Sequence, residues 1–138
     1  MESDARMLVL DASAVVAWLC KEPGYQVVDR LIPIAVAPAS AMAETLYRAR
    51  ERGHRMDSRE AYQHLISYGL QMESVEPADS VRAADLIHGS RTGGGVAGSL
   101  SLGDGLCIAV AERLGLAITG SDRYWETLDL SVPFHPFR

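Results

Sequence analysis

Short apolar runs alternate along the chain with longer segments in which apolar positions recur every three or four residues. The short runs predict buried strands, and the longer segments predict amphipathic helices. The expected strands cover residues 7–10, 32–36, 72–75 and 116–119, with a last one near 131–134. The expected helices cover residues 14–20, 25–31, about 40–52, 77 to about 87 and 101–114, and a further helix begins at 58. This alternation indicates an α/β fold with a mostly parallel sheet and right-handed crossovers.

Capping and helix-breaking residues mark the ends of these helices. Asp57 and Ser101 are expected N-caps, and Pro77 suits the first turn of a helix. Gly53 and Gly115 are expected to end the helices that precede them. The helix that begins at 58 is expected to present one apolar face, made of Tyr62, Leu65, Ile66 and Leu70.

The composition is that of a folded protein. Of the 138 residues, 48% are hydrophobic and 22% are charged, which excludes a disordered or fibrous chain. We expect a single domain over residues 1–138, with residues 1–6 as a short N-terminal extension. No apolar run approaches the ~18–20 residues that span a bilayer, and the start lacks the features of a secretory signal. We therefore expect a cytoplasmic protein that does not enter a membrane.

The charged residues are unevenly distributed. Thirteen basic and eighteen acidic residues give a net charge of −5, and Lys21 is the only lysine. Arginine suits phosphate binding, and five arginines are concentrated between positions 48 and 59. We favour a solvated helix face for them, because Glu51 and Arg55 have the i,i+4 order of an exposed helical pair.

Several other residue types give no functional prediction. Residues 93–98 match the dinucleotide-binding pattern G-x-G-x-x-G, but an expected helix precedes them where that pattern requires a strand, so we predict a flexible loop. The two cysteines, Cys20 and Cys107, lie in apolar patterns and indicate neither a disulfide framework nor a zinc site. The four histidines have no shared spacing and are expected to have surface or packing roles; they are His54, His64, His88 and His135.

Four acidic residues follow strands or begin helices. Each has a local structural explanation, and taken singly that explanation is the better one. Asp11 can cap the first helix, and Glu44 can pair with Arg48 at i,i+4. Asp104 completes a capping box with Ser101, and Asp122 fits an Asx turn.

Taken together, the four acids predict a metal site. In a parallel α/β sheet, strand ends and the helix N-termini that follow them lie along one edge, where ligands bind. Two carboxylates 4 Å apart repel by about 4 kcal/mol at an effective dielectric constant near 20, so such a cluster must either take up protons or bind a cation. Oxygen ligands without histidine or cysteine suit Mg²⁺ or Mn²⁺.

Four motifs containing these acids follow one another in order: Val9-Leu10-Asp11-Ala12-Ser13-Ala14, Ala43-Glu44, Leu100-Ser101-Leu102-Gly103-Asp104 and Ser121-Asp122-Arg123-Tyr124-Trp125. Together they resemble the motif series of PIN-domain ribonucleases, and more narrowly that of VapC-type toxins from bacterial and archaeal toxin–antitoxin pairs. The resemblance runs from about residue 7 to the C-terminus.

The resemblance implies a three-layer α/β/α sandwich, usually homodimeric, that cuts RNA with Mg²⁺ or Mn²⁺ and leaves 5′-phosphate and 3′-hydroxyl ends. It assigns catalysis and metal binding to an acidic quartet, and a contact to the metal or the scissile phosphate to Ser13. The quartet is Asp11, Glu44, Asp104 and Asp122. Two positions depart from the family pattern. Gly120 stands where Thr is common and Ala41 where Asn is common, which concerns substrate positioning rather than the quartet.

Our first functional hypothesis is therefore a metal-dependent endoribonuclease that acts as the toxin of a toxin–antitoxin pair. Its expected partners are an RNA substrate, a second copy of the chain and a cognate antitoxin that docks in an apolar groove. Residues considered for that groove are Trp18, Tyr25, Tyr47 and Tyr62, although core packing explains each equally well. The arginines after Glu44 are expected to contact RNA phosphates.

Other functions with an acidic site remain as alternatives. The second hypothesis is a catalytically inactive PIN-like module that binds metal or RNA. A phosphoacceptor signalling domain would require a lysine after its last strand, and this chain has only Lys21 near its start. A haloacid-dehalogenase-type phosphatase would require a second aspartate where Ser13 stands.

Overall fold

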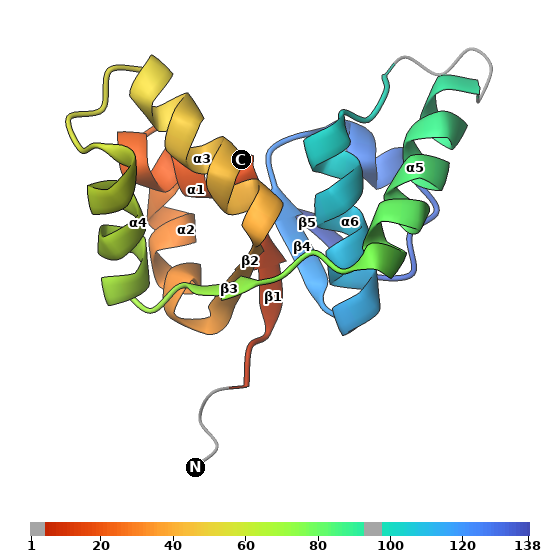
Figure 1. Ribbon diagram of the computed structural model, residues 1–138, viewed down its shortest axis with the longest axis horizontal. Coiled ribbons are helices and arrows are strands. Elements are labelled where there is room, and N and C mark those ends of the chain that lie inside the picture. The colour runs from red at the N-terminus through yellow and green to blue at the C-terminus, as the bar shows by residue number, and fades with distance from the viewer. Residues whose placement is uncertain (1–4, 93–97) are drawn as a thin grey trace.

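A parallel sheet forms the centre of the molecule (Figure 1). The computed structural model describes residues 5–92 and 98–138, and within them five strands pair in the order β3-β2-β1-β4-β5, all in parallel. The strands are β1 (Leu8–Leu10), β2 (Ala35–Pro38), β3 (Gln71–Glu73), β4 (Ala117–Gly120) and β5 (Phe134–Pro136). β1 and β2 are buried along their whole length, which explains their continuous apolar sequences. The parallel α/β fold expected from the sequence is confirmed.

Helices connect the strands and cover both faces of the sheet. They are α1 (Ala12–Cys20), α2 (Tyr25–Leu31), α3 (Ala39–Glu51), α4 (Ser58–Ser67), α5 (Pro77–Thr92) and α6 (Leu102–Leu114), with the short 3-10 helices η1 (Ile32–Ile34) and η2 (Arg123–Thr127). Figure 1 shows α1 to α4 on one side and α5 with α6 on the other.

Two hydrophobic cores account for this three-layer arrangement. Leu8 and Leu10 of β1 join a core made with α1 to α4, whereas Val9 between them joins a second core made with α6. Successive side chains of a strand point to opposite faces of the sheet, so one short strand contributes to both cores. Trp125 is fully buried in the second core and anchors η2 there.

Most of the expected elements are present, but some boundaries differ. Residues 32–34 form a 3-10 helix rather than the start of a strand, because Pro33 in its first turn favours the helical backbone angle. α5 continues to Thr92, beyond the expected end near 87, and β5 begins at Phe134 rather than near 131. The expected glycine-rich loop falls largely on residues 93–97, which lie outside the described residues.

Two predictions about surface side chains were wrong. α4 ends at Ser67, so Leu70 does not belong to the face expected for this helix, and of the other three residues only Leu65 is buried, with Tyr62 and Ile66 37% and 38% exposed. Arg55 lies beyond the end of α3 and cannot form a helical pair with Glu51. The arginine ion pairs of this region are instead Arg48 with Glu44 and Arg52 with Glu22.

A buried ion pair fastens α5 to α6. Asp79 is 2% exposed. Its carboxylate accepts one hydrogen bond from the Glu76 backbone amide and another from Arg113 Nε at 3.1 Å. Burial by itself would raise the pKa of Asp79, but the bonds from Arg113 and Glu76 outweigh it and hold that pKa below its usual value.

No helix within residues 5–92 and 98–138 is both long and apolar enough to span a membrane.

Candidate active site

Asp11 lies at the carboxyl end of the central strand. Its backbone amide donates to the Thr119 carbonyl at 2.9 Å, so the residue continues the pairing of β1 with β4 before the chain turns into α1. Its carboxylate caps α1 by accepting the Ser13 backbone amide at 3.2 Å. The residue is only 7% exposed. The predicted capping role is therefore confirmed, and the carboxylate is buried at the sheet edge.

Ser13 connects Asp11 to the end of β4. Its Oγ donates to Asp11 Oδ2 at 2.8 Å and accepts the Ser121 backbone amide at 3.0 Å. Gly120 leaves room for this arrangement, because a Cβ there would lie 3.2 Å from Asp11 Cβ and 3.4 Å from Ser13 Oγ. A threonine at position 120 would thus crowd both side chains, which gives a physical reason for glycine at this departure from the family pattern.

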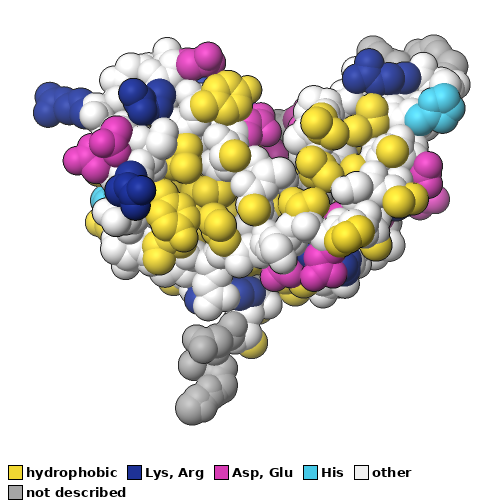
Figure 2. Space-filling view, viewed as in Figure 1, with side chains coloured by type: hydrophobic (Ala, Val, Ile, Leu, Met, Phe, Trp, Pro, Cys, Tyr) yellow, Lys and Arg dark blue, Asp and Glu magenta, His cyan; other side chains and the backbone are white. Residues whose placement is uncertain are grey.

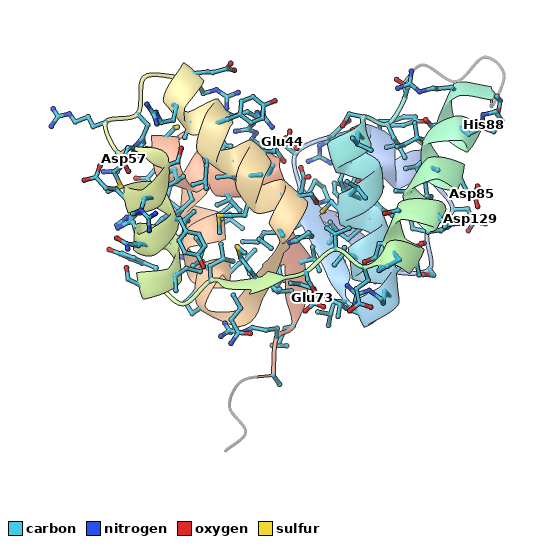
Figure 3. All side chains as sticks on the ribbon, viewed as in Figure 1. Glu44, Asp57, Glu73, Asp85, His88 and Asp129 are labelled. Atoms are coloured by element: carbon cyan, nitrogen blue, oxygen red, sulfur yellow. The ribbon has the colours of Figure 1, made fainter. Side chains whose placement is uncertain are left out.

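Glu44 approaches the same site from α3. Its Oε2 forms the predicted i,i+4 ion pair with Arg48 at 3.1 Å, and Figure 3 shows it on the side of α3 that faces α6. A Cβ on Gly103 would lie 2.5 Å from Glu44 Oε1, closer than real Cβ contacts. Glycine at this position of α6 therefore permits the close approach of α3 and α6. Sequence reasoning missed this contact, although a glycine in the second position of a helix is an available signal.

Asp104 lies at the start of α6. Its Oδ2 accepts the Ser101 backbone amide at 2.9 Å, and its own amide donates to Ser101 Oγ at 3.1 Å. These reciprocal bonds are the capping box expected from the sequence. The cap holds the carboxylate at the helix N-terminus, where the helix dipole favours a negative charge.

Asp104 and Glu44 both lie near enough to Asp11 to affect its ionisation. Burial raises the pKa of Asp11 from 3.8 to about 6; the Ser13 hydrogen bonds oppose this rise, and the charges of Asp104 and Glu44 add to it. The neighbouring Cys107 thiol, buried in α6, also has a raised pKa, from burial and from the same three carboxylates. Like-charge repulsion of Asp11 by Asp104 and Glu44 is the expected effect of carboxylates that lie near a buried one.

Asp122 is the fourth acid of the predicted quartet. It follows β4 at the same edge of the sheet, is exposed, and accepts the Tyr124 backbone amide at 3.0 Å as the N-cap of η2. Its carboxylate thus makes a local capping bond, as the carboxylates of Asp11 and Asp104 also do. The predicted Asx-type turn is confirmed, and convergence with the other acids is shown for three members of the quartet only.

The donor set fits a hard divalent cation in kind. Carboxylate oxygens, with the Ser13 hydroxyl beside them, are the ligands that Mg²⁺ and Mn²⁺ prefer. However, no three His, Cys, Asp or Glu side chains among the described residues are arranged closely enough to hold one ion. Glu44 is paired with Arg48 and Asp104 with the Ser101 amide, so both carboxylates make protein contacts in this conformation.

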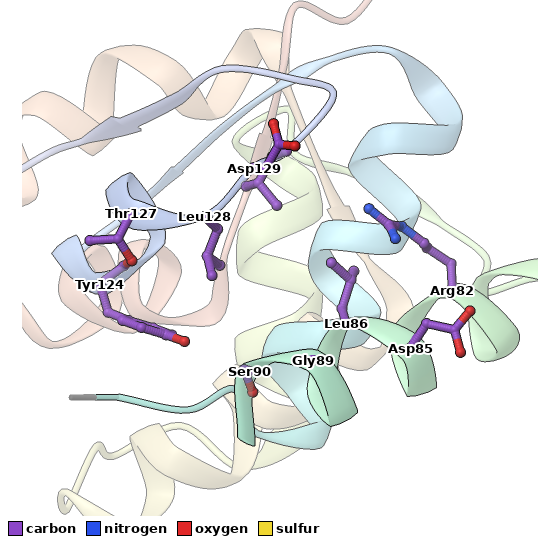
Figure 4. A pocket seen from close by; sticks show the side chains of 10 residues that line it. Arg82, Asp85, Leu86, Gly89, Ser90, Tyr124, Thr127, Leu128 and Asp129 are labelled. Carbon is purple, nitrogen blue, oxygen red and sulfur yellow. The ribbon is translucent and has the colours of Figure 1, made fainter. Parts of the chain in front are cut away.

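The surface has several cavities, of which one opens beside the acids. It lies between α3 and α6, has a volume of about 470 Å³ and includes Glu44 in its lining. A cavity of about 290 Å³ lies between α5 and the segment that follows η2 (Figure 4), and no member of the quartet lines it. Trp18 and Tyr25 share a third cavity, whereas Tyr47 lines the first, so the residues considered for one apolar groove belong to different surfaces.

The cysteines and one histidine can be described from their surroundings in the structure. Both cysteines are free thiols. The His64 ring lies 5.3 Å from the Trp18 ring and 4.9 Å from the Tyr68 ring, so it packs in an aromatic cluster. The packing role expected for this histidine is confirmed.

Comparison with known families assigns the chain to one of them. The PIN domain model matches residues 8–129, which include β1, the acidic cluster and η2. The chain belongs to the PIN domain family.

Solved structures of similar fold come from toxin–antitoxin systems. Rickettsia felis VapBC2 bound to promoter DNA has a TM-score of 0.72 at 12% identity, over 94% of this chain and 98% of that chain. DNA-bound VapBC from Salmonella typhimurium has a TM-score of 0.68 at 13% identity, over 96% and 99%. Mycobacterium tuberculosis VapC20, described as a Sarcin-Ricin loop cleaving toxin, has a TM-score of 0.67 at 15% identity, over 89% and 95%. At these identities the likeness establishes the fold. No curated protein sequence matches the chain.

Proposed function

We propose that the protein is a metal-dependent endoribonuclease. The observation that carries the proposal is the convergence of Asp11, Glu44 and Asp104 from β1, α3 and α6, with the Asp11 pKa raised to about 6. Three carboxylates do not gather at a partly buried site without a cation or a proton to offset their charge. Membership of the PIN domain family and the Sarcin-Ricin loop cleavage named for VapC20 support the same conclusion.

The acidic quartet would hold Mg²⁺ or Mn²⁺, with Asp11 and Asp104 as the principal ligands and Glu44 and Asp122 completing the site. Such an ion lowers the pKa of a bound water and stabilises negative charge on phosphate oxygens during in-line displacement. Ser13 orients the Asp11 carboxylate through the bond to Oδ2 and is itself held by the Ser121 amide. The capping box orients Asp104 in the same way. Arg48 and neighbouring arginines would contact RNA phosphates and set the register of the substrate.

We also propose that the protein is the toxin of a toxin–antitoxin pair, with a cognate antitoxin, a homodimeric state and a cytoplasmic location. The VapBC assemblies of similar fold support this role. Expression of the chain alone should arrest growth, and co-expression of the product of the adjacent reading frame should restore it. Growth that is unchanged both by expression of the chain alone and by co-expression would reject the toxin role, but it would leave the nuclease proposal open.

The activity is tested by incubating the purified protein with structured RNA in Mg²⁺, in Mn²⁺ or in EDTA. Cleavage is expected with either metal and not with EDTA. Asp11→Asn and Asp104→Asn should each reduce the rate at least a hundredfold. Glu60→Gln is a matched control, because Glu60 holds the same third position in the capping box of α4 that Asp104 holds in α6. It should leave the rate unchanged. Full activity in both site variants would reject the site.

The second candidate is an inactive PIN-like module that binds metal or RNA. It is favoured by the ion pair of Glu44 with Arg48 and by the lack of three close ligands among the described residues. Calorimetry with Mn²⁺ separates the two candidates. Binding that depends on Asp11, together with no cleavage of any RNA in a broad pool, would identify the inactive module.

A further inference from the structure

The acids of the candidate site come from two lobes of the molecule. Figure 2 shows acidic side chains in the notch between the lobe of α1 to α4 and the lobe of α5 and α6. In the first lobe Asp11 caps α1 and Glu44 lies on α3, whereas Asp104 lies on α6 in the second lobe. Whether the Asp104 carboxylate reaches the other two acids therefore depends on what fixes the first turn of α6.

The residue that precedes the N-cap of α6 is held at both polar groups of its backbone by the end of α5. The Leu100 amide donates to Ser90 Oγ at 3.0 Å, and Arg91 Nη2 donates to the Leu100 carbonyl at 3.2 Å. Ser90 Oγ itself donates to the Ile87 carbonyl at 2.7 Å, which orients the hydroxyl toward the Leu100 amide as an acceptor. The Leu100 side chain is fully buried in the second core. We call the bonds from Ser90 and Arg91 to this backbone the Leu100 clamp.

The first turn of α6 also lies in close contact with α5. A Cβ on Gly105 would lie 2.8 Å from Ile87 Cδ1, so glycine at this position permits the contact. Gly105 directly follows Asp104, and its amide donates to the Ser101 carbonyl at 3.0 Å. The residue whose carbonyl orients Ser90 thus also contacts the turn that carries Asp104.

We propose that Ser90 and Arg91 are positioning residues for Asp104. The clamp fixes Leu100, the N-cap Ser101 follows directly, and the reciprocal bonds of the capping box then set the direction of the Asp104 carboxylate. The inference rests on the proposed function, because it treats Asp104 as a metal ligand. Removing a group that orients a metal ligand typically lowers metal affinity by about 10–100-fold.

A contribution to stability alone would give different results. Losing a hydrogen bond that only stabilises the fold lowers the melting temperature but leaves the metal affinity of the folded protein unchanged. Losing a bond that positions Asp104 weakens metal binding even far below the melting temperature. Arg91 gives a second distinction, because removing its positive charge would by itself favour the binding of a cation.

Calorimetric titration with Mn²⁺, well below the melting temperature of each variant, provides the test. Ser90→Ala should weaken Mn²⁺ binding roughly tenfold, and Arg91→Ala should also weaken it despite the lost positive charge. Ser90→Thr keeps the hydroxyl and should bind Mn²⁺ as the wild type does. Ser67→Ala is the matched control, because Ser67 Oγ on α4 also donates to the carbonyl three residues before it, and it should leave Mn²⁺ binding unchanged.

RNA cleavage gives a second measurement of the same effect. In Ser90→Ala the Mn²⁺ concentration that gives half the maximal rate should rise by the same factor, and excess Mn²⁺ should restore the rate. The KM for RNA should change little, because the clamp acts on the metal site and contacts no substrate.

Hydrogen exchange in the metal-free protein tests the clamp independently of the proposed function. In Ser90→Ala the amides of Asp104 and Gly105, which donate to Ser101, should exchange about five- to tenfold faster, the factor that corresponds to one hydrogen bond. Unchanged exchange at both amides would overturn the inference. So would an unchanged Mn²⁺ affinity in Ser90→Ala when the wild type binds the ion. Faster exchange in Ser90→Ala when the wild type binds no Mn²⁺ would support the clamp and refute the metal site.

Discussion

The Ser13 hydroxyl donates to Asp11 Oδ2 at 2.8 Å and accepts the Ser121 backbone amide at 3.0 Å. One side chain thus joins the end of β4 to the buried carboxylate that follows β1. The hydrogen bond favours the ionised form of Asp11 and partly offsets the effect of burial on its pKa. The ionised form is also the one that a cation needs, so under the proposed function Ser13 would prepare Asp11 for metal binding.

Replacing Ser13 by Ala should therefore raise the pKa of Asp11 above its value of about 6. A hydrogen bond to a charged group contributes about 1.5–3 kcal/mol, which corresponds to a shift of about one to two pKa units. The acidic limb of the RNA-cleavage pH profile should move to higher pH by a similar amount. Ser67→Ala, which removes a hydroxyl bonded to the His64 carbonyl within α4, should leave the profile in place. A profile that does not move in Ser13→Ala would contradict the role assigned to this bond.

Removing the charge of Asp11 should stabilise the metal-free protein. The folded state raises the pKa from 3.8 to about 6, so it binds the proton more tightly than the unfolded chain. Stability from this group is complete below the unfolded pKa and is lost as pH rises through 6, which costs about 3 kcal/mol above that pH. In EDTA at pH 7.5, Asp11→Asn should melt several degrees above the wild type, and the difference should shrink at pH 5.

Metal should reverse this order. Mn²⁺ should raise the melting temperature of the wild type, because a cation that binds only the folded state stabilises it. The response should be absent in Asp11→Asn. An equal response of both proteins to Mn²⁺ would show that Asp11 is not a ligand.

Gly103→Ala tests the close approach of α6 to Glu44. The new Cβ would lie 2.5 Å from Glu44 Oε1, so the carboxylate must move away from its present position. Alanine is favoured over glycine within a helix by about 1 kcal/mol, which offsets the cost of moving the Glu44 side chain, so the melting temperature should change little. RNA cleavage should fall at least tenfold, because the Glu44 carboxylate is displaced. Gly89→Ala on α5 is the matched control, since nothing lies within 4 Å of its new Cβ. It should leave cleavage intact, and loss of cleavage in this variant too would show that the effect is not specific to Glu44.

The sequence was most informative where structure is determined locally. Asp57 and Ser101 cap the helices they were expected to cap, because a capping box depends on residues only three positions apart. The apolar run around Pro33 was misleading, because a 3-10 helix and the start of a strand both bury apolar side chains. The fixed φ angle of proline favours the helix here. Contacts between distant segments were the least accessible. The approach of Gly103 to Glu44 depends on how α3 packs on α6, so a glycine early in α6 can signal a close contact but does not identify its partner.

The candidate site follows the same division. The positions of Asp11, Glu44 and Asp104 after strands and at helix starts predicted that they would meet, since parallel strands end at one edge. In the structure Asp104 and Glu44 lie near enough to Asp11 to raise its pKa, and the exposed Asp122 caps η2 at the same edge of the sheet. Sequence position gives the edge of the sheet but not the direction of an exposed side chain.

The buried pair of Asp79 and Arg113 should make stability depend on pH outside the candidate site. The pKa of Asp79 is lowered in the folded state, so its contribution is present above the unfolded pKa and is lost as pH falls through the folded one. Breaking a buried pair costs about 3–5 kcal/mol, and the partial exposure of Arg113 places Asp79→Asn near the lower end of that range. Urea unfolding at pH 7 should show this loss, and the gap to the wild type should narrow at an acidic pH below the lowered pKa of Asp79, where the wild-type carboxylate also takes up a proton. Asp85→Asn, an exposed acid on the same helix, should change stability by less than about 0.5 kcal/mol at either pH. An Asp79→Asn deficit of equal size at both pH values would mean that the carboxylate charge contributes nothing and that packing alone joins α5 to α6.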